Sequence, residues 1–229
     1  MSVPVLKLLS SMAAREVLGE LAAAFTGVTG QAVSAEAAGG VDVAKRIAAG
    51  EAADVVVLSD TAIDKLIAGG SLAAPRFDLV KSGVAIAVRS GAAAPAVDTE
   101  EAVRAAVVDA QSLSYSTGPS GVYLEKLFER WGVLESLRPR IVVPPPGIPV
   151  GQLVAEGRAA LGFQQLSELL NVPGIQVLGP LPDSIQTITT FSGAVCAKSA
   201  LQAAARSLLE FMQQPQASAV KQRHGMLSV

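Results

Sequence analysis

The hydrophobic positions of the first 70 residues follow two patterns that alternate along the chain. Short apolar runs, such as Asp54 to Leu58 (DVVVL), are typical of strands that are buried on both faces. Runs of this kind predict strands at 5–9, 32–36 and 54–58. Apolar residues at helical spacing predict helices at 12–25, 41–49 and 61–68, and we expect Gly27 and Gly30 to end the first helix. The alternation of strands and helices predicts a parallel sheet covered by helices.

The rest of the chain alternates in the same way, with long extended runs at two places. Strands are predicted at 83–88, 113–116, 141–143, 160–163, 177–178 and 186–198. Helices are predicted from the turn at 116–121 through Trp131, at 99–110 and 150–156, and, as the last helix of the chain, at 199–212. The runs near 80–88 and 186–198 are long enough to cross between two lobes. We therefore predict an α/β fold with two lobes, each a mostly parallel sheet flanked by helices: 1–82 plus 195–229, and 83–194.

Composition and charge exclude several classes of partner. Half of the 229 residues are hydrophobic, which is enough for a large core, but only 4% are aromatic. A protein with few aromatic residues lacks the stacking surfaces that single-stranded nucleic acids use. The formal net charge is −2, and no long run of one sign occurs. We therefore expect no nucleic-acid partner and no polybasic membrane patch.

Single copies of cysteine and histidine limit the chemistry further. Cys196 cannot form an internal disulfide, and with His224 near the C-terminus a zinc site or a Ser-His-Asp triad in mid-chain is excluded. The chain has no nucleotide-binding glycine motif, so we expect neither a metal nor a cofactor. We expect Cys196 to be an inert core residue and His224 to lie on the surface.

The chain gives no sign of membrane insertion or export. No apolar run reaches the length of a membrane span, and the first residues lack the basic and apolar regions of a signal peptide. These features predict a cytoplasmic protein. A periplasmic location follows instead if a leader was removed and Met1 supplied in its place.

The turn after the first predicted strand is a candidate ligand site. Ligands of open α/β sheets bind beyond the carboxyl ends of the strands. The candidate residues of this turn are Ser10, Ser11, Met12, Ala13 and Arg15. A serine here can simply cap the helix, or its hydroxyl can face a ligand. Arg15 is unusual in a first helical turn, where acidic residues are favoured, so it is either solvated or paired with a bound anion.

Two further turns have the same character. Gly39 and Gly40 precede a helix and either form a tight turn with Asp42 as cap, or let backbone approach a ligand closely. In the sequence GPSG at 118–121, proline suits the first helical position. We expect it to leave the amides of Ser120, Gly121 and Val122 free, which is the strongest sign of an anion site in the chain.

Other polar positions are weaker candidates. The loop from Pro144 to Ile148 follows a strand and is either a stiff connection or a binding loop. Gln164 and Gln165 end a strand, where their amides can hydrogen-bond a ligand. Asp54 and Asp60 lie at opposite ends of one predicted strand, so they are too far apart to act as a catalytic pair.

On four stretches the chain resembles the type II periplasmic binding proteins, in their molybdate-binding branch. The stretches are LLSSMAAREVLGELAAAFTGVTG, VDVAKRIAAGEAADVVVLSD, GPSGVYLEKLFERWG and GRAALGFQQLSEL. The resemblance implies two α/β lobes that close on a small anion bound in the cleft between them. It places the family's ligand-binding positions at Ala13, Gly39 to Val41, Ser120, Gly121, Gly147, Ile148 and Gln165. An ABC permease is an implied partner only if the chain is exported.

The chain departs from that branch where hydroxyl donors are expected. Ala13 and the Gly39-Gly40 turn lack hydroxyls, and Gln165 stands where the family has a tyrosine. With Arg15 added, the departures favour an organic polycarboxylate over molybdate, so we expect an organic-anion-binding protein. The alternative is an isomerase, because aconitate isomerases resemble the same branch and move a proton within a tricarboxylate. Glu36, Asp60 and Tyr123 are then the candidate bases.

Overall fold

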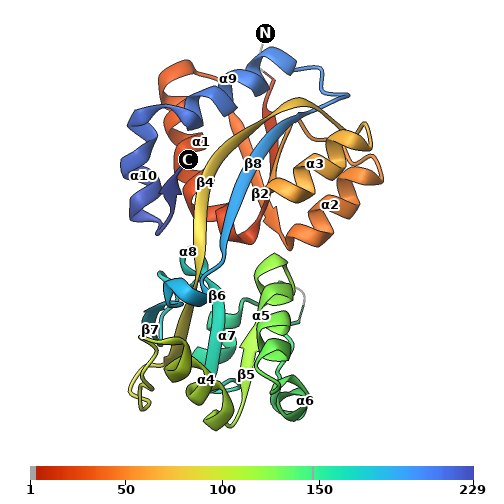
Figure 1. Ribbon diagram of the computed structural model, residues 1–229. Helices are drawn as coiled ribbons and strands as arrows, with labels where there is room; N and C mark the ends of the chain where they lie inside the picture. The colour runs from red at the N-terminus through yellow and green to blue at the C-terminus, as the bar shows by residue number, and fades with distance from the viewer. Residues whose placement is uncertain (1–3, 146) are drawn as a thin grey trace. The chain divides into compact units, whose positions relative to one another are not determined.

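The structure, a computed structural model, describes residues 4–145 and 147–229. Contacts divide the chain into two compact units: unit 1 is Met1–Ser82 with Thr190–Val229, and unit 2 is Gly83–Thr189. The chain passes between the units inside two uninterrupted strands, β4 and β8 (Figure 1). The predicted boundaries lay at 82/83 and 194/195.

Unit 1 is built on a mixed sheet in the order β2-β1-β3-β8-β4, with β9 on the outer side of β4. Its strands are β1 (Leu6–Ser11), β2 (Val33–Ala38), β3 (Val55–Ser59), β9 (Leu227–Ser228), most of β8 (Ile188–Cys196) and the first part of β4 (Leu72–Arg89). β1 is parallel to both β2 and β3, as the alternating pattern predicted. β8 is antiparallel to β3, so the sheet is parallel only in its first half.

Helices cover both faces of this sheet (Figure 1). They are α1 (Arg15–Thr29), α2 (Gly40–Ala48), α3 (Asp60–Ala68), α9 (Gln202–Gln213), α10 (Ser218–Arg223) and the short 3-10 turns η1 (Met12–Ala14) and η4 (Pro215–Ala217). Leu6 and Leu8 share a core with α1 and α9, whereas Leu9 faces α2 and α3. Because successive strand residues point to opposite faces, a strand between two helical layers has to be apolar throughout.

Two predictions about helices in unit 1 were wrong. Gly27 lies inside α1, and the helix ends at Gly30, which has φ +74° and donates its amide to the carbonyl of Thr26. A left-handed residue is needed only at the true end of a helix, and Gly27 does not adopt that conformation. The predicted helix 199–212 is not the last one, because α10 and β9 follow it.

Unit 2 has a smaller mixed sheet in the order β5-β6-β4-β7. Its own strands are β5 (Leu113–Tyr115), β6 (Leu161–Gln165) and β7 (Ile175–Pro180). β5 and β6 are parallel, and both β6 and β7 are antiparallel to β4. The predicted strand at 141–143 is reduced to one parallel bridge between Ile141 and Leu113.

The helices of unit 2 also lie on two faces. They are α4 (Glu100–Asp109), α5 (Pro119–Arg130), α6 (Leu134–Leu137), α7 (Val150–Ala155), α8 (Leu166–Leu169), η2 (Arg138–Arg140) and η3 (Asp183–Ile185). Val84 and Ile86 of β4 pack with α4 and α5, and Ala85 and Ala87 pack with α8. Small residues occur on the second face because α7 lies close to the sheet: a Cβ added at Gly162 would come within 2.5 Å of a Val154 methyl.

Candidate functional site

In unit 1, the parallel strands β1, β2 and β3 end side by side, and a helix begins directly after each. The strands end at Ser11, Ala38 and Ser59. The helical segments that follow begin at residues 12, 40 and 60, and the N-cap residue of each makes no side-chain hydrogen bond to the first turn. In α3 the Thr61 amide donates to the side chain of Asp60. First-turn amides without a cap carry the positive end of the helix dipole. This edge therefore has the geometry of an anion site.

Ser11 supplies a side-chain donor at the same edge. Its side chain is buried, with 8% of the residue exposed, and its Oγ has no hydrogen-bond partner in the described part of the chain. A buried hydroxyl without a partner is uncommon and costs free energy in the unliganded protein. A bound ligand that accepts a hydrogen bond from Ser11 would remove that cost.

Gly40 keeps the space next to Ser11 open. A Cβ built on Gly40 would lie 3.5 Å from the Ser11 Cβ and 3.8 Å from a Leu58 methyl, so any longer side chain would cover Ser11. Gly39 is the N-cap of α2, since its carbonyl accepts from the Val43 amide at 2.9 Å. Asp42 does not cap this helix. The interpretation with Asp42 as cap is therefore wrong, and contact of this turn with a ligand stays a prediction.

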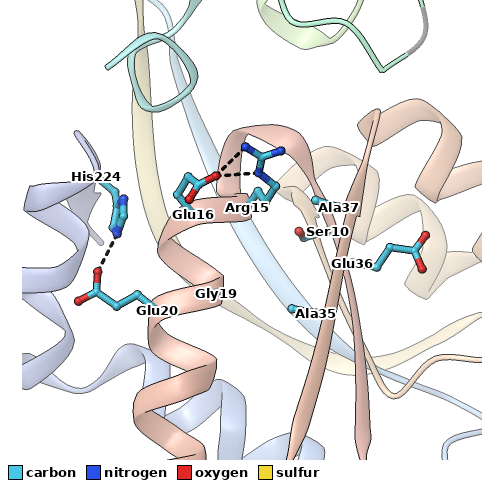
Figure 2. A pocket seen from close by; sticks show the side chains of 9 residues that line it. All are labelled: Ser10, Arg15, Glu16, Gly19, Glu20, Ala35, Glu36, Ala37 and His224. Carbon is cyan, nitrogen blue, oxygen red and sulfur yellow. Dashed lines mark hydrogen bonds and ion pairs between the residues drawn. The ribbon is translucent and has the colours of Figure 1, made fainter. Parts of the chain in front are cut away.

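Ser10 and Arg15 face a different part of unit 1. Ser10 points to the α1 side of the sheet, where it lines an open pocket of about 510 Å³ between α1 and β2 (Figure 2). Arg15 also lines it, but its guanidinium donates to Glu16 at 2.8 Å and is more than half exposed. Glu16 is thus the anionic partner of Arg15. Met12 and Ala13 lie between these residues in η1, and Ala13 packs against the core.

In unit 2, the turn before α5 is closed by its own backbone. The amides of Gly121 and Val122 both donate to the carbonyl of Gly118, at 3.0 and 3.2 Å. The prediction that these two amides are free was therefore wrong, because the chain folds back over Pro119 tightly enough for Gly118 to accept both. Ser120 is buried, and its hydroxyl is hydrogen-bonded to that of Ser116 at 2.8 Å.

The other predicted residues of unit 2 also have partners within the unit. Gln164 accepts from the Gly151 amide at 3.2 Å, which satisfies the start of α7, and donates to Glu168. Gln165 donates to Thr189 at 2.9 Å. Their role in ligand binding stays a prediction, and it would require these hydrogen bonds to be exchanged.

The predicted loop before α7 is described except for Pro146. Gly147 has φ +79°, which favours glycine, and Ile148 donates its amide to the carbonyl of Pro145 at 3.0 Å. The Ile148 side chain packs against the small core of α7. Contact of this loop with a ligand stays a prediction.

The three candidate bases differ in the hydrogen bonds and ion pairs that they already form. Glu36 forms an ion pair with Arg46 at 2.7 Å, and Figure 2 shows its carboxylate pointing away from Arg15. The hydroxyl of Tyr123 donates to the carbonyl of Ile185 at 2.8 Å. Asp60 is half-buried in the first turn of α3, at the same edge as Ser11, and accepts one hydrogen bond, from the Thr61 amide. Asp60 is therefore the candidate that remains accessible beside the strand ends.

Cys196 and His224 lie outside these turns, and the sequence predicts an inert core residue and a surface residue. Cys196 is buried, as expected, and burial raises the pKa of its thiol to about 12. His224 is not a simple surface residue: its Nε2 lies 2.8 Å from Glu20 of α1, and its side chain is only 17% exposed. No local pattern could have revealed this contact, because Glu20 and His224 are 204 residues apart. The described residues contain no cluster of metal-ligating side chains.

Comparison with known proteins covers nearly the whole chain. Residues 6–227 match the model of a family described as bacterial extracellular solute-binding protein. The aconitate isomerase of a Pseudomonas species is 39% identical over 236 residues, which cover 99% of this chain and 89% of that protein. None of the helices in the described residues is long and apolar enough to span a membrane.

Solved structures of low sequence identity share the fold. The periplasmic molybdate-binding protein of Azotobacter vinelandii superposes with a TM-score of 0.80 at 22% identity, covering 98% of this chain and 99% of that one. The sulfate-binding protein of Mycobacterium tuberculosis superposes with a TM-score of 0.79 at 16% identity, covering 98% and 87%. These neighbours confirm the predicted type II periplasmic-binding-protein fold.

Proposed function

Since the chain belongs to the family of bacterial extracellular solute-binding proteins, we propose that it binds a small polycarboxylate at the ends of β1, β2 and β3 and interconverts the cis and trans forms of aconitate. Ser11 carries the binding part of this proposal. Its buried, unpartnered hydroxyl lies beside a glycine and among uncapped helix starts, which suits a carboxylate oxygen.

The isomerase part rests on the Pseudomonas relative, which matches this chain from end to end. Moving the double bond of aconitate requires a base that removes a proton from the CH₂ carbon. The same group returns the proton to the CH carbon at the other end of the three-carbon unit, so no oxidant or reductant is consumed. We assign this role to Asp60, because Glu36 is paired with Arg46 and Tyr123 donates to a carbonyl.

The test combines turnover with binding. Wild-type protein is incubated with cis-aconitate, and the appearance of the trans isomer is followed by proton NMR. Asp60→Asn should lower the rate at least about 100-fold while aconitate still stabilises the protein against heat. Asp109→Asn, an exposed residue of unit 2, is the matched control and should retain full activity.

Ser11→Ala separates the binding site from the catalytic step. Loss of one hydrogen bond to a charged ligand should weaken aconitate binding about tenfold. The urea midpoint of the free protein should stay the same or rise, because the Ser11 hydroxyl has no partner to lose and its unmet hydrogen bond costs free energy. Unchanged affinity in Ser11→Ala would remove this edge from the proposal, and absence of both turnover and stabilisation in the wild type would reject aconitate altogether.

A receptor for an exported or imported solute is the second candidate, favoured by the match to the solute-binding family. It predicts ligand stabilisation without turnover, together with a periplasmic location and an ABC permease as partner. The isomerase proposal predicts turnover of aconitate, so the NMR assay above distinguishes the two.

A further inference from the structure

A second pocket of unit 1 lies apart from all the predicted ligand residues. It is an open pocket of about 580 Å³ between the first part of β4, the end of α9, α10 and β9. Its polar lining consists of Arg76, Asp78, Gln213, Ser218, Lys221 and Ser228. None of these residues belongs to the strand ends at which we propose that aconitate binds, so this pocket is separate from that site.

Lys221 is the unusual member of this lining. Only 2% of the residue is exposed, and no hydrogen bond or ion pair joins its ammonium group to a described residue. The nitrogen is not among the fully buried atoms without a partner, so it reaches the open pocket. Burial lowers the pKa of the Lys221 amine. Lysines with this degree of burial are almost always paired, because an isolated buried charge costs several kcal/mol. The pocket is the open space into which this amine can direct its hydrogen bonds.

The carboxylate in the pocket does not neutralise Lys221. Asp78 accepts from Arg76 at 3.0 Å and from the Ser192 hydroxyl at 2.6 Å. The second hydrogen bond of Arg76 goes to Asp64 at 2.5 Å, so Arg76 keeps further N–H donors for another partner. Both hydrogen bonds of Asp78 are accepted by its Oδ1, and its charge is paired with that of Arg76.

Neutral donors complete the lining. The Ser228 hydroxyl donates to the Ser218 hydroxyl at 3.1 Å, which joins β9 to α10 and leaves the O–H of Ser218 as a donor at the pocket. The amide of Gln213 donates to the backbone carbonyl of Asp78 at 2.9 Å. Of the charged side chains that line the pocket, Arg76 and Asp78 are paired with each other, whereas Lys221 has no ion pair with a described residue.

We propose that this pocket binds a small anion, through a carboxylate or phosphate group that pairs with Lys221 and accepts further hydrogen bonds from Arg76 and Ser218. The anion supplies the partner that the buried ammonium lacks. The site is independent of aconitate binding and turnover, and it makes the stability of unit 1 dependent on anion concentration.

The primary experiment measures protection of Lys221 in the unmodified protein. Reductive methylation with formaldehyde is followed residue by residue by mass spectrometry, without anion and with inorganic phosphate or succinate. At an anion concentration ten times its dissociation constant, methylation of Lys221 should be about tenfold slower, while exposed Lys65 should be unaffected. An unchanged rate at Lys221 with both anions overturns the proposal.

A matched set of variants separates this site from the proposed aconitate site. Lys221→Met keeps the length of the apolar stem and should fold, since it removes an unpaired buried charge. The thermal stabilisation by phosphate or succinate should be lost in Lys221→Met and retained in Lys65→Met and in Ser11→Ala. Loss in Ser11→Ala with retention in Lys221→Met would assign the anion to the strand ends of β1 to β3 instead. Protection by succinate alone identifies a carboxylate ligand, and protection by phosphate identifies a phosphorylated one; either supports the site.

Discussion

At the scale of single residues, the close approach of the Ser116 backbone explains why residue 121 is a glycine. A Cβ at this position would lie 1.7 Å from the carbonyl oxygen of Ser116 and 2.8 Å from its carbonyl carbon. The turn before α5 therefore closes only with glycine at this position.

We expect Gly121→Ala to destabilise the protein by about 2 kcal/mol or more, because neither backbone segment can move without opening the turn. Gly118→Ala is the matched control. Its Cβ would have only the Ser116 hydroxyl within reach, at 3.8 Å, and as an N-cap change it should cost less than about 1 kcal/mol. Urea denaturation followed by circular dichroism measures both; equal effects would show that the close approach to Ser116 is relieved elsewhere.

Residue-scale predictions from the sequence succeeded where a local rule decides the outcome. Pro119 occupies the first turn of α5, as the preference of proline for that position predicted. The state of the amides of Gly121 and Val122 could not be predicted in this way. Two competing acceptors were available to them, a ligand and the Gly118 carbonyl, and only the folded turn decides between these.

At the scale of elements, an ion network ties α2 to β1 and β2. Arg46 of α2 donates to Glu36 of β2 and, at 2.5 and 2.6 Å, to Glu51, which also pairs with Lys7 of β1 at 3.2 Å. The hydrogen bonds from Arg46, and next those from Lys7, lower the pKa of Glu51 to about 2.

The lowered pKa of Glu51 determines how the stability of the fold depends on pH. The folded state binds the Glu51 proton more weakly than the unfolded state, so the network stabilises the fold above pH about 4.5 and is lost as the pH falls toward about 2. Replacing Glu51 by Gln should therefore lower the urea midpoint at neutral pH, with the difference from wild type vanishing toward pH about 2. Glu129→Gln, on an exposed part of α5, is the control and should show no such convergence. A difference that persists at the lowest pH would exclude the ion network as its cause.

Elements with strong local patterns were predictable, and elements set by distant pairing were not. The helices α2 and α3 were predicted within one residue of their ends, since glycines follow both of them. β4 was predicted only over 83–88, yet it runs from Leu72 to Arg89. Its first half contains Pro75, Arg76 and Asp78, which break a strand pattern, and it is held as a strand by its place beside β8 and by pairing with β9.

At the scale of the whole molecule, each unit has its own apolar core. The clusters around Leu6, Leu8 and Leu9 contain residues of unit 1 alone, and those around Val84, Ala85 and Val150 contain residues of unit 2 alone. Unit 2 is also continuous in sequence. Gln186 fastens its two chain ends by accepting from the Val84 amide at 3.0 Å and donating to the Val84 carbonyl at 3.1 Å.

We therefore expect the fragment 83–189 to fold by itself with a cooperative thermal transition. The fragment 1–82 is the matched comparison. It lacks β8, which lies between β3 and β4 in the sheet, so it should show no cooperative transition. Differential scanning calorimetry decides; a fragment 83–189 without a transition would mean that its core depends on unit 1.

The two predicted boundaries between the units rest on different evidence in the sequence. The first crossing was placed at 82/83 because the apolar run there begins at Gly83. The second crossing lies within a uniformly extended stretch, Ile188–Cys196, in which no change of composition marks where one core ends.

The burial of Cys196 has a practical consequence for spectroscopy. A thiol that is 6% exposed and has its pKa raised to about 12 stays protonated and hidden from maleimide reagents at neutral pH. Any cysteine introduced at an exposed site, such as Val41 of α2 or Val122 of α5, would be the reactive one. Fluorophores or spin labels can then be attached singly or in pairs to the otherwise native chain, and the response of each unit to its ligand can be recorded without first removing a background thiol.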